Sequence, residues 1–424
     1  MKQSKSFFRG YSLVLHSLLT YLIYAAAAST GLNIIVPIFA AENGLDQNAI
    51  LSANTVGAFI SCIAVVLGGK IIMKYGVRKI TTISLIVGGL LGTVLMGYVH
   101  TVAGYAICTI FAQCAVHGYC YTATNTLITN WWPRKKGFVM GITTCGIMAA
   151  SFTAITLMSK VGNAYGMKTM AWMLGGFMVL FGIISWFWIR NNPEECGLNP
   201  DNMPLSAEEV QAGLASKQDA LEAAKRWPFK ELVKNKAVWI LGIVFGLFLL
   251  FTSGVASTTV AMCIENGYTP AQGLTVLSLT GVVSIVGSLV SGVLDQKFGP
   301  KITTVIYGIW VAISFATLLF IPGGVRAIVC IAMANFTMGA TSNLAPSFVG
   351  SIFGRAAFAQ VYRWMYALSF LVRSLCFLML GTGVAILGSY TSVYIVFGVL
   401  SLVAVVLCFF VSDKKIQVPS TEKV

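Results

Sequence analysis

The sequence predicts an all-α membrane protein that crosses the bilayer with twelve transmembrane helices, arranged as two pseudo-symmetric six-helix halves. Three observations predict this fold class: the apolar composition, an internal repeat and the placement of the basic residues. Hydrophobic residues make up 57% of the 424 residues and charged residues only 10%, and the mean hydropathy is +0.82. A soluble domain carries roughly 25% charged residues, so most of this surface must face lipid.

Apolar segments separated by short polar turns recur along the whole chain, and each span needs about 20 such residues. The polar, proline-containing stretch 191–236 is predicted to be a cytoplasmic linker and residues 413–424 a cytoplasmic tail, which leaves two six-helix halves at 1–190 and 237–412. The expected helices lie at about 12–41, 48–73, 79–99, 102–131, 137–161, 166–190, 237–264, 270–295, 301–321, 325–353, 358–387 and 390–412.

An internal repeat supports the two halves. Glu42-Asn43-Gly44 recurs as Glu265-Asn266-Gly267, which is 223 positions later. Parallel halves of this kind are related by an axis along the membrane normal in one class of transporter folds. The same offset, without a gap, pairs Leu51 with Leu274, Ser61 with Ser284, Gly69 with Gly292 and Gly76 with Gly299.

The net charge of +14 can indicate a nucleic-acid partner, but the positions of the bases favour a topology signal. With a cytoplasmic N-terminus, nearly all Lys and Arg residues fall on one side. The other side keeps only Lys160, Lys168 and Arg326, and Arg373 alone lies in mid-membrane. This positive-inside distribution predicts a multi-pass protein of the cytoplasmic (inner) membrane with both termini cytoplasmic, and no nucleic-acid partner.

Two features of the chain allow another interpretation. The N-terminus resembles a signal peptide, with basic residues, an apolar run and the small cluster 25–29. The apolar run continues to Phe39, so we expect it to be retained as the first helix, with His16 near the interface. The ten cysteines show no metal-ligand spacing, so we interpret them as reduced packing residues and expect no metal or cofactor.

A glycine-spaced basic turn follows the predicted second helix, Gly69-Lys-Ile-Ile-Met-Lys-Tyr-Gly-Val-Arg-Lys79, and its counterpart follows the eighth. This turn resembles the signature loop of the major facilitator superfamily. The resemblance implies that fold, and a latch in which an acid of the loop pairs with a neighbouring helix. Met73 stands where the family usually has Asp, and in the second copy Gln296 does, with an acid one residue earlier. The residues of the two latch loops are Gly69, Lys74, Gly76, Arg78, Asp295, Lys297 and Gly299.

Three further segments are similar to the oxalate–formate antiporter and monocarboxylate branch of that superfamily: 130–137 (NWWPRKKG), 193–201 (PEECGLNPD) and 351–355 (SIFGR). They are scaffold turns and name no substrate. The branch uses two cavity bases, one each in helices 8 and 11, and an alignment from the flanking turns places Ser288 and Ser369 there. One base, Arg373, lies a turn beyond Ser369 on the same face, which fits a singly charged anion better than a compact dianion.

Arg373 is the first candidate for a substrate-binding residue. It lies about fifteen residues into the predicted helix 358–387, where an arginine costs a few kcal/mol, and no Asp or Glu falls near the centre of any predicted span. A guanidinium offers a planar fork that fits a carboxylate with two hydrogen bonds. The alternative is a structural arginine that snorkels to the interface or bonds to helix-end carbonyls.

A polar stripe on the fourth predicted helix is the second candidate. Gln113, His117, Tyr121 and Asn125 recur every four residues, so we expect them on one face, toward protein or a water-filled cavity. By the resemblance, helices 1, 4, 7 and 10 line the central cavity, and Tyr121 matches the branch's helix 4 tyrosine. His117 is expected to bond an anion or carry a proton, or else to be a satisfied interhelical histidine. Asn33, Tyr366 and Ser369 complete the predicted substrate-binding residues.

We therefore expect a monomeric secondary transporter that moves a monocarboxylate-type organic anion through the lipid bilayer by alternating access, with a proton or counter-anion as the coupled partner. The absence of mid-membrane acids favours exchange or facilitated movement over proton symport. Alternatives are a proton-coupled symporter of a bulky amphipathic acid such as a bile acid, a transporter of zwitterions and a non-transporting membrane sensor. A membrane-embedded enzyme would need a nucleophile, metal cluster or carboxylate pair in the spans, and the sequence offers none.

Overall fold

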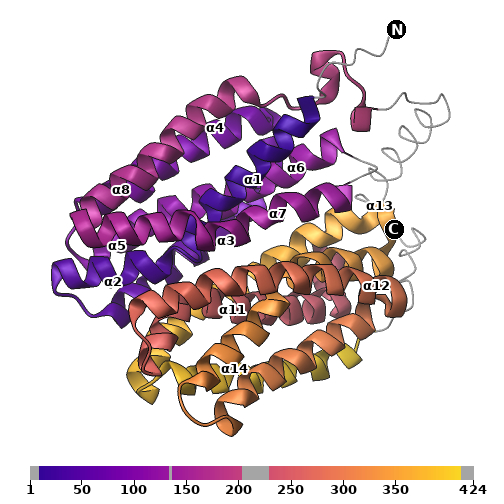
Figure 1. The fold of residues 1–424 in the computed structure, drawn as a ribbon. Helices are drawn as coiled ribbons and strands as arrows, with labels where there is room; N and C mark the ends of the chain where they lie inside the picture. Colours follow the sequence, from indigo (N-terminus) through magenta and orange to yellow (C-terminus); the bar gives the residue numbers. More distant parts are fainter. Residues whose placement is uncertain (1–8, 133–135, 203–228, 412–424) are drawn as a thin grey trace. The chain divides into compact units, whose positions relative to one another are not determined.

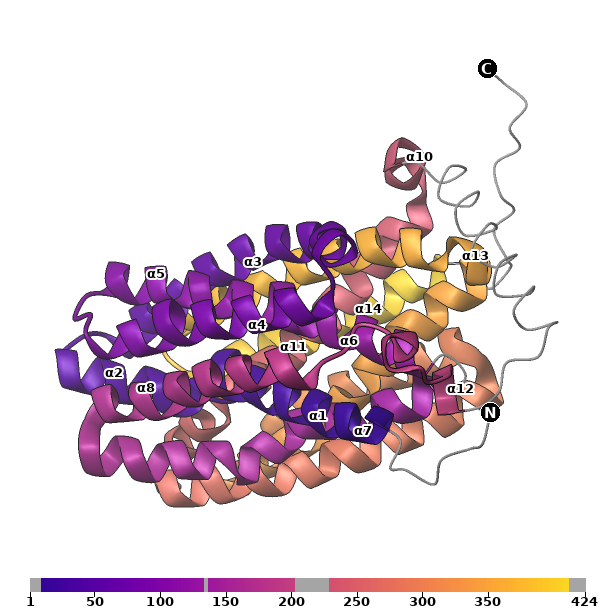
Figure 2. The same ribbon diagram turned by 90° about the horizontal axis from the view of Figure 1, so that it is seen from above.

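The computed structural model describes residues 9–132, 136–202 and 229–411. The chain divides into two compact units, Met1–Leu205 (the N-terminal unit) and Ser206–Val424 (the C-terminal unit). All regular elements of the described residues are helices, and within each unit they run side by side (Figures 1 and 2). Most of the predicted linker, 203–228, and the predicted tail, 413–424, lie outside the described residues.

The N-terminal unit contains two helices with π-helical segments. One is the third predicted helix, whose second half is the π segment η1, and the other is the fourth, interrupted by the π segment η3. The elements are α1 (Arg9–Ala28), α2 (Leu32–Asn43), α3 (Gln47–Tyr75), α4 (Val77–Val87), η1 (Gly88–Val94), a 3₁₀ turn (Leu95–Gly97), α5 (Val102–Gln113), η3 (Cys114–Cys120), α6 (Tyr121–Trp131), α7 (Lys136–Phe152), α8 (Ala154–Trp188), and two short 3₁₀ turns (Pro193–Cys196 and Pro200–Asn202).

The C-terminal unit has fewer but longer elements. Its α11 packs along α13 and α14, and α12 packs along the same two helices (Figure 1). A proline inside α13, Pro346, follows the place where that helix bends. The elements are α10 (Phe229–Lys234), α11 (Lys236–Glu265), α12 (Pro270–Phe320), α13 (Val325–Leu387) and α14 (Tyr390–Phe409).

The segments account for twelve spans. Ten segments of the described residues are long and apolar enough to cross a membrane, if the bent pair Val325–Thr341 and Leu344–Phe353 counts as one. Two of the ten, Ile142–Trp188 with 47 residues and Pro270–Phe320 with 51, are more than twice the roughly 20 residues that a span needs. Each is broken at a glycine with positive φ, Gly166 at 81° and Gly299 at 80°. Counted as two spans each, they complete the twelve predicted from the sequence.

The first half of α12 shows how these helices face lipid. Its large apolar side chains, such as Leu279, Leu289 and Val293, are 62–68% exposed, whereas Ser284 and Ser291 are buried. Since lipid is as apolar as leucine, helices in a membrane associate through small residues and hydrogen bonds instead of through large apolar ones. The pattern confirms a multi-pass membrane protein.

The internal repeat is confirmed by matching backbone and side-chain geometry. Gly76 and Gly299 turn the chain with nearly the same angles, φ 82° and ψ 157° against φ 80° and ψ 164°. Glu42 accepts a hydrogen bond from the Met167 amide at 2.6 Å. Its counterpart Glu265 accepts one from the Tyr390 amide at 2.5 Å. Each acid thus caps the last helix of its own unit.

The first predicted helix, 12–41, is not continuous. It divides at residues 29–31 into α1 and α2. There the Ala25 carbonyl accepts from both the Ser29 and the Gly31 amides, at 3.3 and 3.0 Å, and the second of these bonds spans six residues. A Cβ atom on Gly31 would lie 1.7 Å from the Ala26 carbonyl oxygen, so the break requires glycine at this position.

Candidate functional site

Arg373 lies on α13 in the C-terminal unit, with only 1% of its surface exposed. Its Nε atom donates to the Ser253 hydroxyl on α11 at 2.7 Å. The guanidinium stacks over Phe370, 4.8 Å from the ring centre, and lies 6.0 Å from Phe377. The two terminal nitrogens, Nη1 and Nη2, are buried and have no hydrogen-bond partner among the described residues. The fork of the guanidinium therefore keeps donors for another group.

Close packing of α11 against α13 holds Arg373 in place. On one side of it, a Cβ atom on Gly246 would lie 3.0 Å from the Ser369 carbonyl oxygen, and on the other a Cβ on Gly254 would lie 3.3 Å from the Cys376 sulfur. The Ser369 hydroxyl also donates to the Gly242 carbonyl at 2.9 Å. Ser369, a predicted substrate-binding residue, is thus fully buried in this helix contact.

No carboxylate of the described part of the C-terminal unit neutralises Arg373. Glu231 pairs with Lys234 at 3.2 Å, and Glu265 caps α14. Asp295 accepts a hydrogen bond from the Ser347 hydroxyl at 2.6 Å. A buried charge without a partner is costly, because its desolvation is not repaid.

An aromatic row along α13 leads to Arg373. The Tyr362 and Tyr366 rings stack at 5.5 Å, and the Tyr366 and Phe370 rings are 5.7 Å apart. These residues and Phe377 are spaced by three or four positions around Arg373, so they share one helix face. The predicted residue Tyr366 therefore contacts Phe370, whose ring in turn contacts the Arg373 guanidinium.

A second cluster in the N-terminal unit joins α1 to the fourth span. We call it the tyrosine cluster; it consists of Tyr21, Tyr24, His117, Tyr121 and Asn125. The Tyr24 ring meets His117 edge-on at 4.5 Å and lies 5.7 Å from Tyr121, which is 5.4 Å from Tyr21. The Tyr21 hydroxyl donates to the Asn125 side-chain oxygen at 2.8 Å. Tyr24, Tyr121 and Asn125 are half-buried, so the cluster keeps an accessible side.

Gln113 does not hydrogen-bond to this cluster. It ends α5, and its stem packs on α3, where a Cβ on Gly57 would lie 3.1 Å from the Gln113 Cγ. Its side-chain oxygen is buried without a partner among the described residues. The π segment η3 begins at the next residue, and its wider turn shifts the four-residue spacing on which the predicted stripe depends.

Asn33 lies just after the break in the first span. Its side-chain amide donates to the Thr30 carbonyl at 2.8 Å, and it is 5% exposed. It therefore stabilises the start of α2. The sequence pattern did not reveal the break, because Ser29 and Thr30 adjoin a run of alanines that resembles ordinary helix packing.

His16 is fully buried in the protein, and its ring lies 5.5 Å from that of Trp188 at the end of α8. Its Nε2 atom is 2.7 Å from the Ser185 hydroxyl, which itself donates to the Phe181 carbonyl at 2.6 Å. Since that hydroxyl has one proton, Nε2–H is the donor in the bond to Ser185. The ring stacks on Phe181 at 4.8 Å.

The predicted latch loops contact their own units. After Gly76, the Arg78 amide donates to the Asn191 side-chain oxygen at 3.0 Å, and its guanidinium lies 4.3 Å from the Trp186 ring. Lys74 lies over Tyr75 and Lys297 over Phe298, each at 5.2 Å. Gly69 belongs to α3 and Gly299 breaks α12, while Asp295 bonds to Ser347 on α13. The displaced acid of the second copy thus joins two helices of one unit.

Residues 18–377 match the family model of the Major Facilitator Superfamily. The oxalate:formate antiporter of Oxalobacter formigenes is 26% identical over 385 residues, covering 87% of this chain and 83% of that protein. The uncharacterized MFS-type transporter YhjX of Escherichia coli K12 is 25% identical over 327 residues, covering 73% and 72%.

Solved structures agree in fold. The proton:xylose symporter XylE bound to 6-bromo-6-deoxy-D-glucose superposes with a TM-score of 0.72 at 16% identity, over 97% of this chain and 98% of that one. The inward-open conformation of the xylose transporter XylE from E. coli gives 0.70 at 16% identity, over 94% and 96%. At 16% identity, the similarity to these structures shows the fold alone.

Proposed function

Because this chain belongs to the Major Facilitator Superfamily, and is therefore a secondary transporter and not an enzyme, we propose that it carries a small organic anion of the monocarboxylate type. Arg373 is the substrate's carboxylate-binding residue. The observation that carries the proposal is the buried guanidinium whose Nη1 and Nη2 atoms have no hydrogen-bond partner among the described residues. Two parallel N–H donors match the two oxygens of a carboxylate.

Charge balance favours a monoanion. Among the described residues, Arg373 is the only lysine or arginine that is fully buried. One carboxylate neutralises one guanidinium, whereas a dianion would leave an uncompensated charge in a medium of low dielectric constant. The similarity to the oxalate:formate antiporter supports organic anions as the class.

Exchange is the proposed mode of transport. Among the described residues, no Asp or Glu of a span is fully buried, and the one span acid with a buried oxygen, Asp295, is held by the Ser347 hydroxyl just before the break at Gly299. A carboxylate proton relay in mid-membrane is therefore not favoured. A counter-anion bound at Arg373 would neutralise the guanidinium while the protein reorients its binding site to the other side of the membrane. We also propose that both termini are cytoplasmic, because the bases Arg9, Arg78 and Arg190 gather at one end of the N-terminal unit.

The tyrosine cluster supports a second candidate, a zwitterion. Tyr21, Tyr24 and Tyr121 present three ring faces and edges within one group, and such faces attract alkylammonium groups through cation–π interactions. A betaine and an amino acid belong in the substrate panel for this reason.

The test is uptake by proteoliposomes of a labelled panel of monocarboxylates, oxalate and zwitterions. The vesicles are preloaded or empty, with and without a pH gradient. We expect uptake of a monocarboxylate that depends on internal anion, with Arg373→Ala at background. The matched control is Arg326→Ala, which removes an arginine bonded to Asn266 at the end of a helix and should transport normally. Transport by a folded Arg373→Ala protein at the wild-type rate would refute the role of Arg373.

A further inference from the structure

The end of α8 gathers three arginines from separate parts of the N-terminal unit. Arg9 begins α1, Arg78 is the second residue of α4 and Arg190 lies two residues after the end of α8. Each of the three contacts one or two residues of the segment 186–189, which consists of Trp186, Phe187, Trp188 and Ile189. We call this group the arginine cluster.

Among the described residues, the contacts of these three arginines use only a few of their N–H donors. Arg9 donates from Nη2 to the carbonyls of Phe187 and Trp188, at 3.3 and 3.0 Å. Arg190 donates from Nη1 to the carbonyls of Phe187 and Ile189, at 3.2 and 3.0 Å. The Phe187 carbonyl is shared, so the two guanidiniums are neighbours. Arg78 stacks on Trp186 at 4.3 Å, and its Nε is buried with no hydrogen-bond partner among the described residues.

No acid neutralises the cluster within the described residues. The nearby carboxylate of Glu195 accepts from the Asn191 amide and side chain, at 3.2 and 3.1 Å. Lys79, next to Arg78, is exposed and adds a further positive charge. The negative end of the α8 dipole favours cations here, but three guanidiniums exceed the half charge of a helix end.

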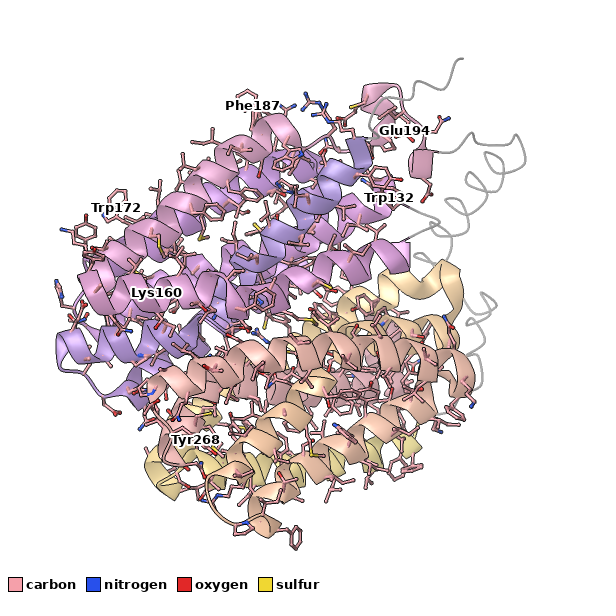
Figure 3. All side chains as sticks on the ribbon, viewed as in Figure 1. Trp132, Lys160, Trp172, Phe187, Glu194 and Tyr268 are labelled. Carbon is pink, nitrogen blue, oxygen red and sulfur yellow. The ribbon has the colours of Figure 1, made fainter. Side chains whose placement is uncertain are left out.

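The cluster lies at the end of an apolar segment. The apolar segment that includes α8 ends at Trp188, and an exposed aromatic pair marks the boundary, Trp186 at 36% and Phe187 at 68% exposed. Aromatic side chains gather at the membrane–water interface. Figure 3 labels Phe187 at this end of the N-terminal unit.

We propose that the arginine cluster is a binding site for the phosphate group of an anionic phospholipid. Guanidinium forks bind phosphate oxygens with paired hydrogen bonds, and basic pockets at the ends of spans attract anionic headgroups. Arg78 belongs to the turn that joins the second and third spans, while Arg9 and Arg190 flank the first and sixth. A bound headgroup would therefore join three segments of one unit, which are the start of α1, the start of α4 and the residues after α8. This inference is independent of the transported substrate.

The first measurement is native mass spectrometry of the purified protein with equal amounts of phosphatidylglycerol and phosphatidylcholine that have the same acyl chains. We expect the wild type to retain phosphatidylglycerol preferentially. The triple variant Arg9→Gln/Arg78→Gln/Arg190→Gln should lose the preference, at about fivefold per arginine. Absence of a preference in the wild type would overturn the proposal, whatever the variants do.

Controls separate this site from general charge and from loss of folding. The variant Lys160→Gln/Lys168→Gln removes two bases from the other end of the unit and should keep the preference. If the triple variant does not fold, the single variant Arg78→Gln takes its place. The Arg78 side chain stacks on a ring and donates to no backbone carbonyl among the described residues, so its loss should disturb the fold least. Displacement of the lipid by millimolar inorganic phosphate would identify a small-anion site instead. An equal loss of the phosphatidylglycerol preference in the lysine variant would mean that net charge, and not this site, causes the preference.

Discussion

The Nε atom of Arg373 donates a hydrogen bond to the Ser253 hydroxyl over 2.7 Å, which joins α13 to α11 across 120 residues of sequence. This bond fixes one edge of the guanidinium and orients the other. The free edge carries Nη1 and Nη2, the two atoms without a partner among the described residues. Ser253 is thus a positioning residue for the proposed carboxylate site.

We expect Ser253→Ala to weaken substrate binding about tenfold, because a hydrogen bond to a charged group contributes about 1.5–3 kcal/mol. The loss should appear in KM more than in the maximal rate. Ser253→Thr keeps a hydroxyl at the position and should restore the wild-type KM. In an Arg373→Lys background, which has no Nε fork, Ser253→Ala should add little; additive effects on KM would contradict the positioning role.

The break in the first span should not tolerate a side chain at Gly31. A Cβ atom there would lie 1.7 Å from the Ala26 carbonyl oxygen, so Gly31→Ala must close the break or distort the backbone, at a cost above the usual 1–3 kcal/mol of overpacking. We expect a lower melting temperature and loss of transport. The control is Gly176→Ala in α8, where nothing lies within 4 Å of the added atom; its melting temperature should not fall.

A second pair of glycines tests the contact between α12 and α13. A Cβ on Gly287 would lie 1.8 Å from the Phe336 carbonyl oxygen, whereas on Gly292 it would meet nothing within 4 Å. Gly287→Ala should therefore destabilise the protein by several kcal/mol and Gly292→Ala should be neutral. Thermal unfolding followed by circular dichroism in detergent distinguishes them. Equal melting temperatures would show that these helices are not in backbone contact.

The two acids of the repeat should have matching effects on stability. Glu42 caps the sixth span through Met167, and Glu265 caps α14 through Tyr390 and Thr391. Each variant, Glu42→Gln and Glu265→Gln, should cost up to about 1 kcal/mol, because a negative charge is lost from a helix N-terminus.

Glu231→Gln provides the comparison for these caps. It breaks only an exposed pair with Lys234 three residues away, and such pairs contribute little. Its melting temperature should therefore stay that of the wild type. A drop equal to that of the capping variants would mean that the two caps contribute no more than a surface ion pair.

The sequence by itself determined the twelve helices, the repeat and the isolated mid-membrane charge, because hydropathy and charge are local properties that lipid selects directly. It also placed Arg373, His117 and Tyr121 in spans and gave them polar roles. It did not reveal the partners. Ser253, Tyr21 and Tyr24 are ordinary residues of apolar helices until packing brings them to Arg373 and to the tyrosine cluster.

Only the tertiary structure decided three features. The break at Gly31 and the π segment η3 depend on how the backbone is packed, and η3 separates Gln113 from the stripe that a regular four-residue spacing predicts. His16 is buried because Phe181 and Ser185 of α8 cover it. The physical reason is the same in each case: hydrophobic periodicity specifies which residues face protein and which face lipid, but helix–helix contacts between small residues specify where the backbone can bend and which polar groups meet.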